Sequence, residues 1–276
     1  MYRVYIFNHT SGSLAIKDVS KSPKASKPDY EAEATVFRPK SSAQLRAAVK
    51  ACLAKSPSGA FKGGKNGPIG LWDVSLITDM SGLFSGRAKF NADISKWNVS
   101  LVINMSGMFR GAISFCCNIG GWIVSKVKSM RGMFAGAKAF NIDLSGWDVR
   151  NVTDMSEMFA EATSFNGDVS KWKVSRATTT REMFRGATKF NIDLSGWDIS
   201  SVKDMRGMFH KAPSFKFGIK LKLHWPSCTC ISSHPVNARA IGPKSRVYLF
   251  VCCYCARCRS CCALLRACRM RCLGVN

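Results

Sequence analysis

The chain has 276 residues, of which 46% are hydrophobic, and its 41 Lys and Arg residues outnumber 17 Asp and Glu to give a formal charge of +24. This hydrophobic content excludes wholesale disorder, and no run approaches the roughly 18 consecutive apolar residues of a transmembrane helix. Most of the excess positive charge lies at the ends, since residues 216–276 hold 11 basic and no acidic side chains, whereas residues 71–215 hold 18 and 13. The chain is therefore expected to contain several different regions.

The first region, residues 1–35, is predicted to be a mobile basic leader. Lys17, Lys21 and Lys24 stand among Ser and Pro residues, a composition that buries little apolar surface. The apolar run 4–7 is interrupted by Asn8 and is too short for the core of a signal peptide. No clear signal peptide is expected, and the compartment stays open.

Residues 36–70 are predicted to form a capping helix over 41–55 and then a Gly-rich connector. Ser41 and Gln44 have the spacing of a capping box, in which each side chain binds a free backbone N–H at the helix start. The apolar residues that follow occupy one helical face, at i, i+3, i+4, i+7 and i+8: Leu45, Ala48, Val49, Cys52 and Leu53. Such a helix would cover the first unit of a repeat stack.

A 25-residue repeat fills residues 71–215. Three columns of aromatic residues recur at this interval without insertion or deletion, which predicts six stacked units with the columns as interior ladders. The columns are Trp72, Trp97, Trp122, Trp147, Trp172 and Trp197; Phe84, Phe109, Phe134, Phe159, Phe184 and Phe209; and Phe90, Phe115, Phe140, Phe165, Phe190 and Phe215. Packing is favoured over any aromatic ligand site.

Each unit is predicted to be a short strand, a turn at the Trp and a short helix. Residues 140–145 alternate apolar with polar, the period of a strand. Over 154–162 the apolar residues instead recur at i, i+3, i+4 and i+7, with Asp154 and Glu157 placed as helix-capping residues. The expected fold class is an α/β solenoid of about six strand–turn–helix coils.

Two polar columns follow the second Phe column. We interpret both as turn caps, because Asn and Asp side chains accept hydrogen bonds from nearby backbone N–H groups. The alternative, stacked carboxylates that bind calcium, is disfavoured because Asn118 interrupts the column and no second ligand column accompanies it. The columns are Asn91, Asn141, Asn166 and Asn191, and Asp93, Asp143, Asp168 and Asp193.

The unit W-D-V-S-x-V-x-x-M-x-x-M-F-x-x-A-x-x-F-N-x-D-[I/L]-S-x-W, over about residues 68–215, resembles the repeat of BspA-like leucine-rich-repeat surface proteins, in their lipoprotein-type branch. Residues 149–159 lie close to a consensus unit. The resemblance implies a right-handed, leucine-rich-repeat-like solenoid without catalytic activity. It also implies display at the cell surface or secretion, and a role in adhesion or partner binding.

Three units depart from the pattern, and the first does so by Arg87 in place of a small Ala. The second has Cys116 and Cys117 where Asn and its neighbour are expected. The fifth has Ala177 and Thr180 where Val and Met would pack, so we expect it to be the least tightly filled coil.

The C-terminal region divides into a candidate capping strand, 216–227, and a Cys- and Arg-rich tail, 228–276. Ten of the 13 cysteines lie in the tail. A zinc site is disfavoured because the C-x-x-C run is contiguous and lacks a second ligand pair across a loop, and no disulfide pairing is recognisable. We favour the interpretation that the tail is translated from a non-coding or shifted frame, which predicts a disordered basic tail.

We therefore expect a monomeric, non-catalytic scaffold that binds a protein or glycan and carries no cofactor or metal. The alternative is binding of an anionic polymer, either nucleic acid or acidic membrane, through the basic termini. An enzyme is disfavoured because no Ser/His/Asp or Cys/His set is visible. The four histidines lie outside the regular columns or in the last unit.

Overall fold

The computed structural model describes residues 5–7, 14–16, 36–61 and 63–216. The chain divides into two units, Met1–Thr35 and Val36–Asn276. The predictions for the capping strand beyond residue 216 and for the Cys-rich tail lie outside the described residues. In the first unit, strands β1 (Tyr5–Phe7) and β2 (Leu14–Ile16) pair antiparallel, within the segment for which the sequence predicts a mobile leader.

Helix α1 (Ser42–Lys55) opens the described part of the second unit. Ser41 Oγ accepts a hydrogen bond from the Gln44 N–H at 3.2 Å, and Gln44 Oε1 accepts one from the Lys40 N–H at 2.7 Å. Its buried face consists of Leu45, Ala48, Val49, Cys52 and Leu53, which join one hydrophobic cluster with the repeats. A 3-10 turn, η1 (Ile69–Leu71), leads into the first repeat.

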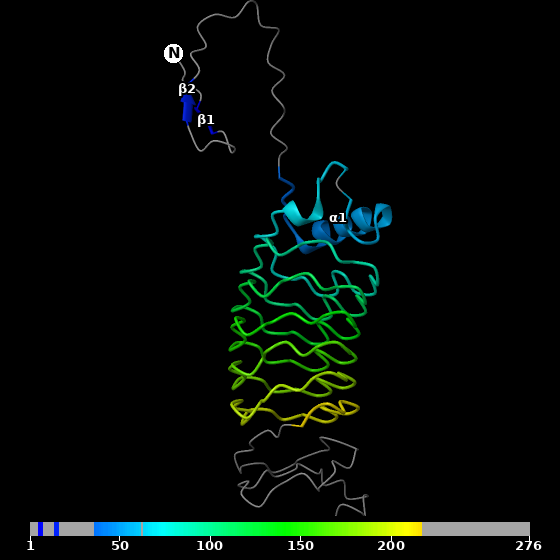
Figure 1. Cartoon of the computed structure of the whole chain (residues 1–276), viewed down its shortest axis with the longest axis vertical. Helices are drawn as coiled ribbons and strands as arrows, with labels where there is room; N and C mark the ends of the chain where they lie inside the picture. The colour runs from blue at the N-terminus through cyan, green and yellow to red at the C-terminus, as the bar shows by residue number, and fades with distance from the viewer. Residues whose placement is uncertain (1–4, 8–13, 17–35, 62, 217–276) are drawn as a thin grey trace, which may run out of the picture. The chain divides into compact units, whose positions relative to one another are not determined.

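The 25-residue units lie one on another as a stack (Figure 1). We number them coils 1 to 6: residues 72–96, 97–121, 122–146, 147–171, 172–196 and 197–216. Isolated parallel bridges join successive coils, from Asp79 and Asn104 through to Thr179 and Asp204. Arg46 of α1 donates to the Ser81 carbonyl, so the helix is tied to the first coil by a polar contact as well as by its apolar face.

The predicted strand and helix of each coil are wrong. Among the described residues, the only helices are α1 and η1, and residues 140–145 and 154–162 form turns, single bridges and extended chain. Glu157 and Glu161, predicted to lie in a helix, both have φ of +57°, in the left-handed region. The hydrogen bonds along these turns explain the difference, because neighbouring N–H groups donate in turn to the next coil and to their own coil. In coil 3, for example, the Phe134 N–H donates to the Met158 carbonyl of the next coil, whereas the Ala135 N–H donates to the carbonyl three residues back.

The coil is thus a run of tight turns in which alternate N–H groups serve the coil itself and the next coil. Left-handed residues recur four apart, and most are Gly, which adopts this conformation at little cost. These Gly residues form two columns that indicate turns, a signal that the helical spacing of the apolar residues obscured. The columns are Gly82, Gly107, Gly132 and Gly207, and Gly86, Gly111, Gly136 and Gly186.

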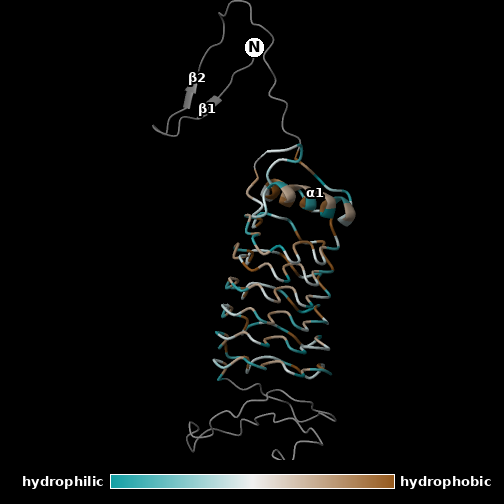
Figure 2. Ribbon diagram, turned by 90° about the vertical axis from the view of Figure 1, so that its right-hand side faces the viewer, coloured by the Kyte–Doolittle hydropathy of each residue, from teal (hydrophilic) through white to brown (hydrophobic). Residues whose placement is uncertain are grey.

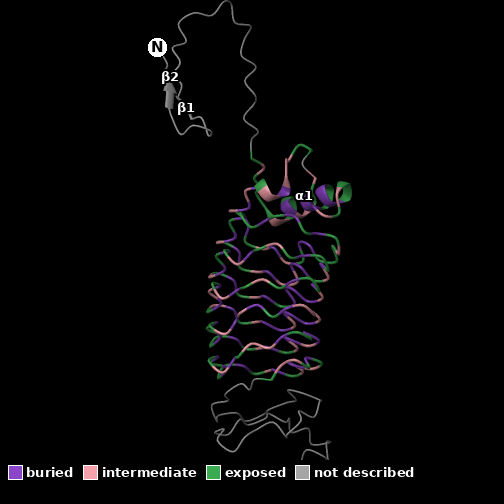
Figure 3. Ribbon diagram, viewed as in Figure 1, coloured by how far each residue is buried: buried purple, intermediate pink, exposed green. Residues whose placement is uncertain are grey.

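The core runs through the whole stack. Buried and exposed residues alternate along each coil (Figure 3), and hydrophobic residues are likewise interspersed with hydrophilic ones (Figure 2). Within a coil the two Phe rings stack at 3.9 Å, as for Phe134 and Phe140. Between coils the rings of one column lie further apart, 5.6 Å for Phe109 and Phe134. Since every coil supplies the same rings, one continuous core forms.

Candidate binding surfaces

The Trp column is buried and hydrogen-bonded, so it offers no ligand-binding surface. Trp147 and Trp172 are only 3% and 2% exposed. The indole N–H of Trp147 donates to the Ile119 carbonyl at 3.1 Å, and that of Trp172 to the Leu144 carbonyl at 2.9 Å. Each indole N–H thereby bonds to a carbonyl 28 residues earlier in the chain, near the end of coil 2 for Trp147 and of coil 3 for Trp172, and ties successive turns of the stack together.

The Asn column joins neighbouring coils. The Asn141 side-chain oxygen accepts from the Asn166 N–H at 2.8 Å, and the Asn166 oxygen accepts from the Asn191 N–H at 2.8 Å. Asn191 continues the series to the Lys216 N–H at 3.1 Å. The sequence predicts caps within one turn, but the acceptor and donor belong to different coils. A local pattern does not reveal a partner that lies in another coil.

The Asp column caps local turns. Asp143, Asp168 and Asp193 each accept a hydrogen bond at 2.8 Å from the N–H two residues later. This geometry is that of an Asx turn. The Ser170 hydrogen bonds hold the pKa of Asp168 below its ordinary value. Among the described residues, no group of three His, Cys, Asp or Glu side chains is placed to hold a metal ion.

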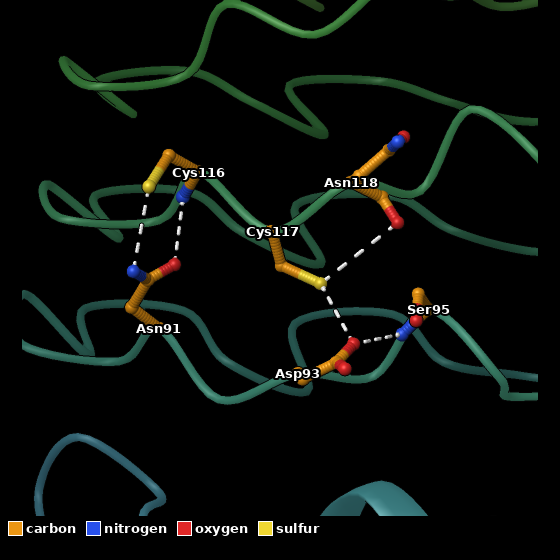
Figure 4. Close-up of a pocket in the computed structure, with 6 residues that line it drawn as sticks. All are labelled: Asn91, Asp93, Ser95, Cys116, Cys117 and Asn118. Carbon is orange, nitrogen blue, oxygen red and sulfur yellow. Dashed lines mark hydrogen bonds between the residues drawn. The ribbon is translucent and has the colours of Figure 1, made fainter.

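A shallow pocket of about 280 Å³ lies where coil 2 departs from the repeat (Figure 4). Cys116 replaces the column Asn, and its N–H donates to Asn91 Oδ1 at 2.9 Å. The Cys117 thiol donates to Asp93 Oδ1 at 3.6 Å. Burial raises the pKa of Cys117, with a smaller effect from Asp93, so this cysteine is held as the thiol and is a poor nucleophile.

A row of ion pairs crosses the turns of coils 2 to 5. Arg110 donates to Glu157 at 2.8 Å across the intervening coil, and Arg185 contacts both Glu161 and Glu182. The Arg110 hydrogen bond is the main reason that the pKa of Glu157 lies below its ordinary value. Because its charges are paired within the protein, this row is better suited to holding the coils in register than to binding a partner.

A different surface combines apolar and basic side chains. Two neighbouring rows flank the buried column that contains Val102 and Val127, and all their members except the half-buried Asn151 are exposed. We call these rows together the two-row face. The first row is Leu76, Leu101, Lys126, Asn151, Arg176 and Ser201, and the second is Thr78, Ile103, Lys128, Thr153, Thr178 and Lys203.

The second row is straight because the backbone holds it in register. Each N–H donates to the carbonyl of the corresponding residue one coil earlier, at 2.8 Å from Lys128 to Ile103 and from Thr153 to Lys128, and at 2.7 Å from Lys203 to Thr178. Sequence analysis did not identify this face. The signal was present as aliphatic residues at polar columns of coils 1 and 2, but their exposure depends on the stack.

The region that the structure describes contains no helix long and apolar enough to cross a membrane. The basic termini, to which the sequence assigns the alternative of polyanion binding, lie largely outside that region, so the alternative stays a prediction. Of the four histidines only His210 is described, in coil 6.

A family model described as "Mycoplasma protein of unknown function, DUF285" matches residues 55–163 and, in a second overlapping match, residues 142–229. Together the two matches span more than half of the chain, and they include all six coils. No curated protein and no solved structure matches the chain.

Proposed function

Because the chain belongs to the DUF285 family and carries its repeat through six coils, we propose that it is a non-catalytic scaffold that binds a protein or glycan partner. The observation that carries this proposal is the straightness of the surface rows. Side chains at corresponding positions of successive coils stand side by side, held by backbone hydrogen bonds such as that from Thr178 to Thr153 at 2.8 Å. A repeat protein presents an extended surface in this way.

As the specific role of this scaffold, we propose adhesion at the cell surface. It is supported by the likeness of the repeat to that of BspA-like leucine-rich-repeat proteins, whose right-handed solenoid we also propose for this chain. The stacked coils support a solenoid, although their run of turns differs from the strand and helix that an α/β solenoid would contain.

Catalysis has little support in the part of the chain that the structure describes. The polar columns repeat from coil to coil and are engaged in hydrogen bonds that hold the coils. The place where the pattern changes, the pocket at Cys117, holds a thiol whose pKa is raised rather than lowered. A nucleophile normally needs the opposite shift.

The test is to present the purified full chain to an array of glycans and extracellular proteins. Binding is expected at micromolar or tighter affinity, on the order of −8 kcal/mol. The matched control is Met130→Asp, which places a charge in the core of coil 3, where Met130 is fully buried. Binding that requires folded coils supports the scaffold. Absence of any partner, or equal binding by the Met130→Asp chain, contradicts it.

A further inference from the structure

The two-row face changes character along the stack. Leu76, Leu101 and Ile103 of coils 1 and 2 are 53%, 38% and 47% exposed. From coil 3 onward the same rows carry Lys126, Lys128, Arg176 and Lys203, with neutral residues, Asn151 and Thr153, in coil 4. An aliphatic patch is therefore followed by a basic stretch on one continuous surface.

The acidic side chains beside this basic stretch already have partners. Asp148 pairs with Arg150 at 2.8 Å, and Asp204 pairs with Arg206 at 2.8 Å. Asp154 accepts from the Ser156 N–H at 2.9 Å. Arginines outside the rows neutralise Asp148 and Asp204, whereas Asp154 bonds neutral groups and keeps its charge. The four basic side chains of the rows exceed that single charge, so the surface is complementary to a partner with negative charge.

From this arrangement we infer that the two-row face binds an extended segment of a partner protein in which a short aliphatic block adjoins an acidic block. The inference rests on the proposed scaffold function and names the partner class. The aliphatic block would cover Leu101 and Ile103, and the carboxylates would lie along the basic side chains of coils 3, 5 and 6, which are Lys126, Lys128, Arg176 and Lys203. Such a segment matches both the order and the chemistry of the rows.

The segregation of the face favours a protein segment over two other partners. A membrane surface is laterally uniform, so it gives no reason for the aliphatic and the basic side chains to lie at different ends of the face. Neutral sugars are bound chiefly by aromatic rings, and the exposed large apolar side chains among the described residues are all aliphatic.

The test measures binding of the full chain to a synthetic peptide in which an aliphatic block adjoins a glutamate block. A second peptide has the same composition with the two residue types interspersed. The block peptide is expected to bind about tenfold more tightly, because only its order matches the face. Equal affinity for the two peptides would overturn the inference.

Matched variants locate the site. Ile103→Ser is expected to weaken the block peptide about tenfold. Its control, Ile113→Ser, alters an aliphatic residue of similar exposure, 43%, outside the two rows and is expected to change affinity less than about twofold. Equal losses in both variants would overturn the assignment to this face.

Charge reversal provides the second pair. Lys128→Glu with Lys203→Glu is expected to weaken binding about tenfold and to flatten its salt dependence. The control, Lys138→Glu with Lys189→Glu, makes the same charge change at two exposed lysines outside the rows. Loss of binding in the control alone, or in both pairs equally, contradicts the inference.

Binding of the full chain to phosphatidylserine vesicles and to heparin is measured as well, as probes of a membrane and of a sulfated glycan. Tighter binding of either than of the block peptide, with the same dependence on Ile103 and Lys128, would replace the protein segment by a membrane or a sulfated glycan and overturn the inference. A partner from the array that binds independently of both residues would overturn this inference alone. A chain that binds neither peptide nor array partner would overturn the scaffold function as well.

Discussion

Coils 4 and 5 have nearly the same backbone but different core residues. The Phe159 N–H of coil 4 donates to the next coil at 2.8 Å, and the Phe184 N–H of coil 5 does so at 2.9 Å. The paired Phe rings stack at 3.9 Å in both. Yet coil 4 has Met155 where coil 5 has Thr180, a fully buried residue.

The difference teaches that the coil geometry depends on the hydrogen bonds and the aromatic ladders, while the smaller core residues adjust its stability. Among the described residues, Thr180 Oγ1 is a buried side-chain oxygen without a hydrogen-bond partner. A buried hydroxyl without a partner is destabilising, and Thr also fills less space than Met. Coil 5 should therefore be the weaker of the two.

The largest expected effect comes from removing what the two coils share. Phe159→Ala should lower the free energy of unfolding by about 3–5 kcal/mol, because a fully buried ring is lost and a cavity remains. Chemical denaturation of the full chain checks this. The exposed Ile113→Ala should change it by less than about 0.5 kcal/mol. A loss below about 1 kcal/mol for Phe159→Ala would show that the ladder is not the main stabiliser.

Transferring the residue of coil 5 into coil 4 should have the next largest effect. Met155→Thr is expected to cost about 2–4 kcal/mol, since it combines a cavity with a buried hydroxyl. Met155→Leu, which nearly conserves volume, is the control and should cost less than about 1.5 kcal/mol. Equal unfolding midpoints for the two variants would contradict this explanation of the difference between the coils.

The reverse exchange should strengthen coil 5. Thr180→Val replaces the hydroxyl with a methyl group of similar size and is expected to raise the free energy of unfolding by about 1 kcal/mol. Thr180→Ser, which keeps the hydroxyl and loses a methyl group, is expected to lower it by about the same amount. If Thr180→Val is destabilising, the hydroxyl has a partner in solution, and the comparison must be revised.

The contact between coils 4 and 5 can be weakened without altering the core. Asn166→Ala removes the acceptor of the Asn191 N–H and should lower the free energy of unfolding by about 1 kcal/mol. Asn166→Asp keeps an acceptor and should retain more stability. Hydrogen exchange at the Asn191 amide, monitored by mass spectrometry, should accelerate in the Ala variant, and unchanged exchange would contradict the inter-coil role.

The smallest effect concerns Glu157 of coil 4, which pairs with Arg110, whereas its counterpart in coil 5, Glu182, pairs with Arg185. Its pKa is lowered chiefly by the Arg110 hydrogen bond. The ionised carboxylate therefore adds to the free energy of unfolding at pH values above its ordinary pKa of about 4.3, and this stabilisation is lost as the pH falls through the lower folded-state value. Glu157→Gln should therefore reduce the decline of stability with acid, by less than about 1 kcal/mol. Thermal melting from pH 7 down to pH 3 measures it, and an unchanged pH profile would show that the pair contributes nothing.

The sequence was informative wherever side-chain size or local capping was decisive. The 25-residue recurrence of Trp and Phe predicts columns, and the structure stacks those rings from coil to coil. The start of α1 follows from Ser41 and Gln44, because both contacts are local. The difference between Thr180 and the methionines of the other coils was likewise visible in the spacing.

Only the tertiary structure decided the conformation of each coil and the surface it presents. The apolar spacing at 154–162 suits a helix, but alternate N–H groups in these turns find their acceptors in the next coil, so Glu157 adopts a left-handed conformation instead. The exposure of Leu101 and Ile103 has the same cause. By itself, the sequence determined which side chains recur, because their size and spacing are local properties; which groups bond and which face water depended on partners one coil away.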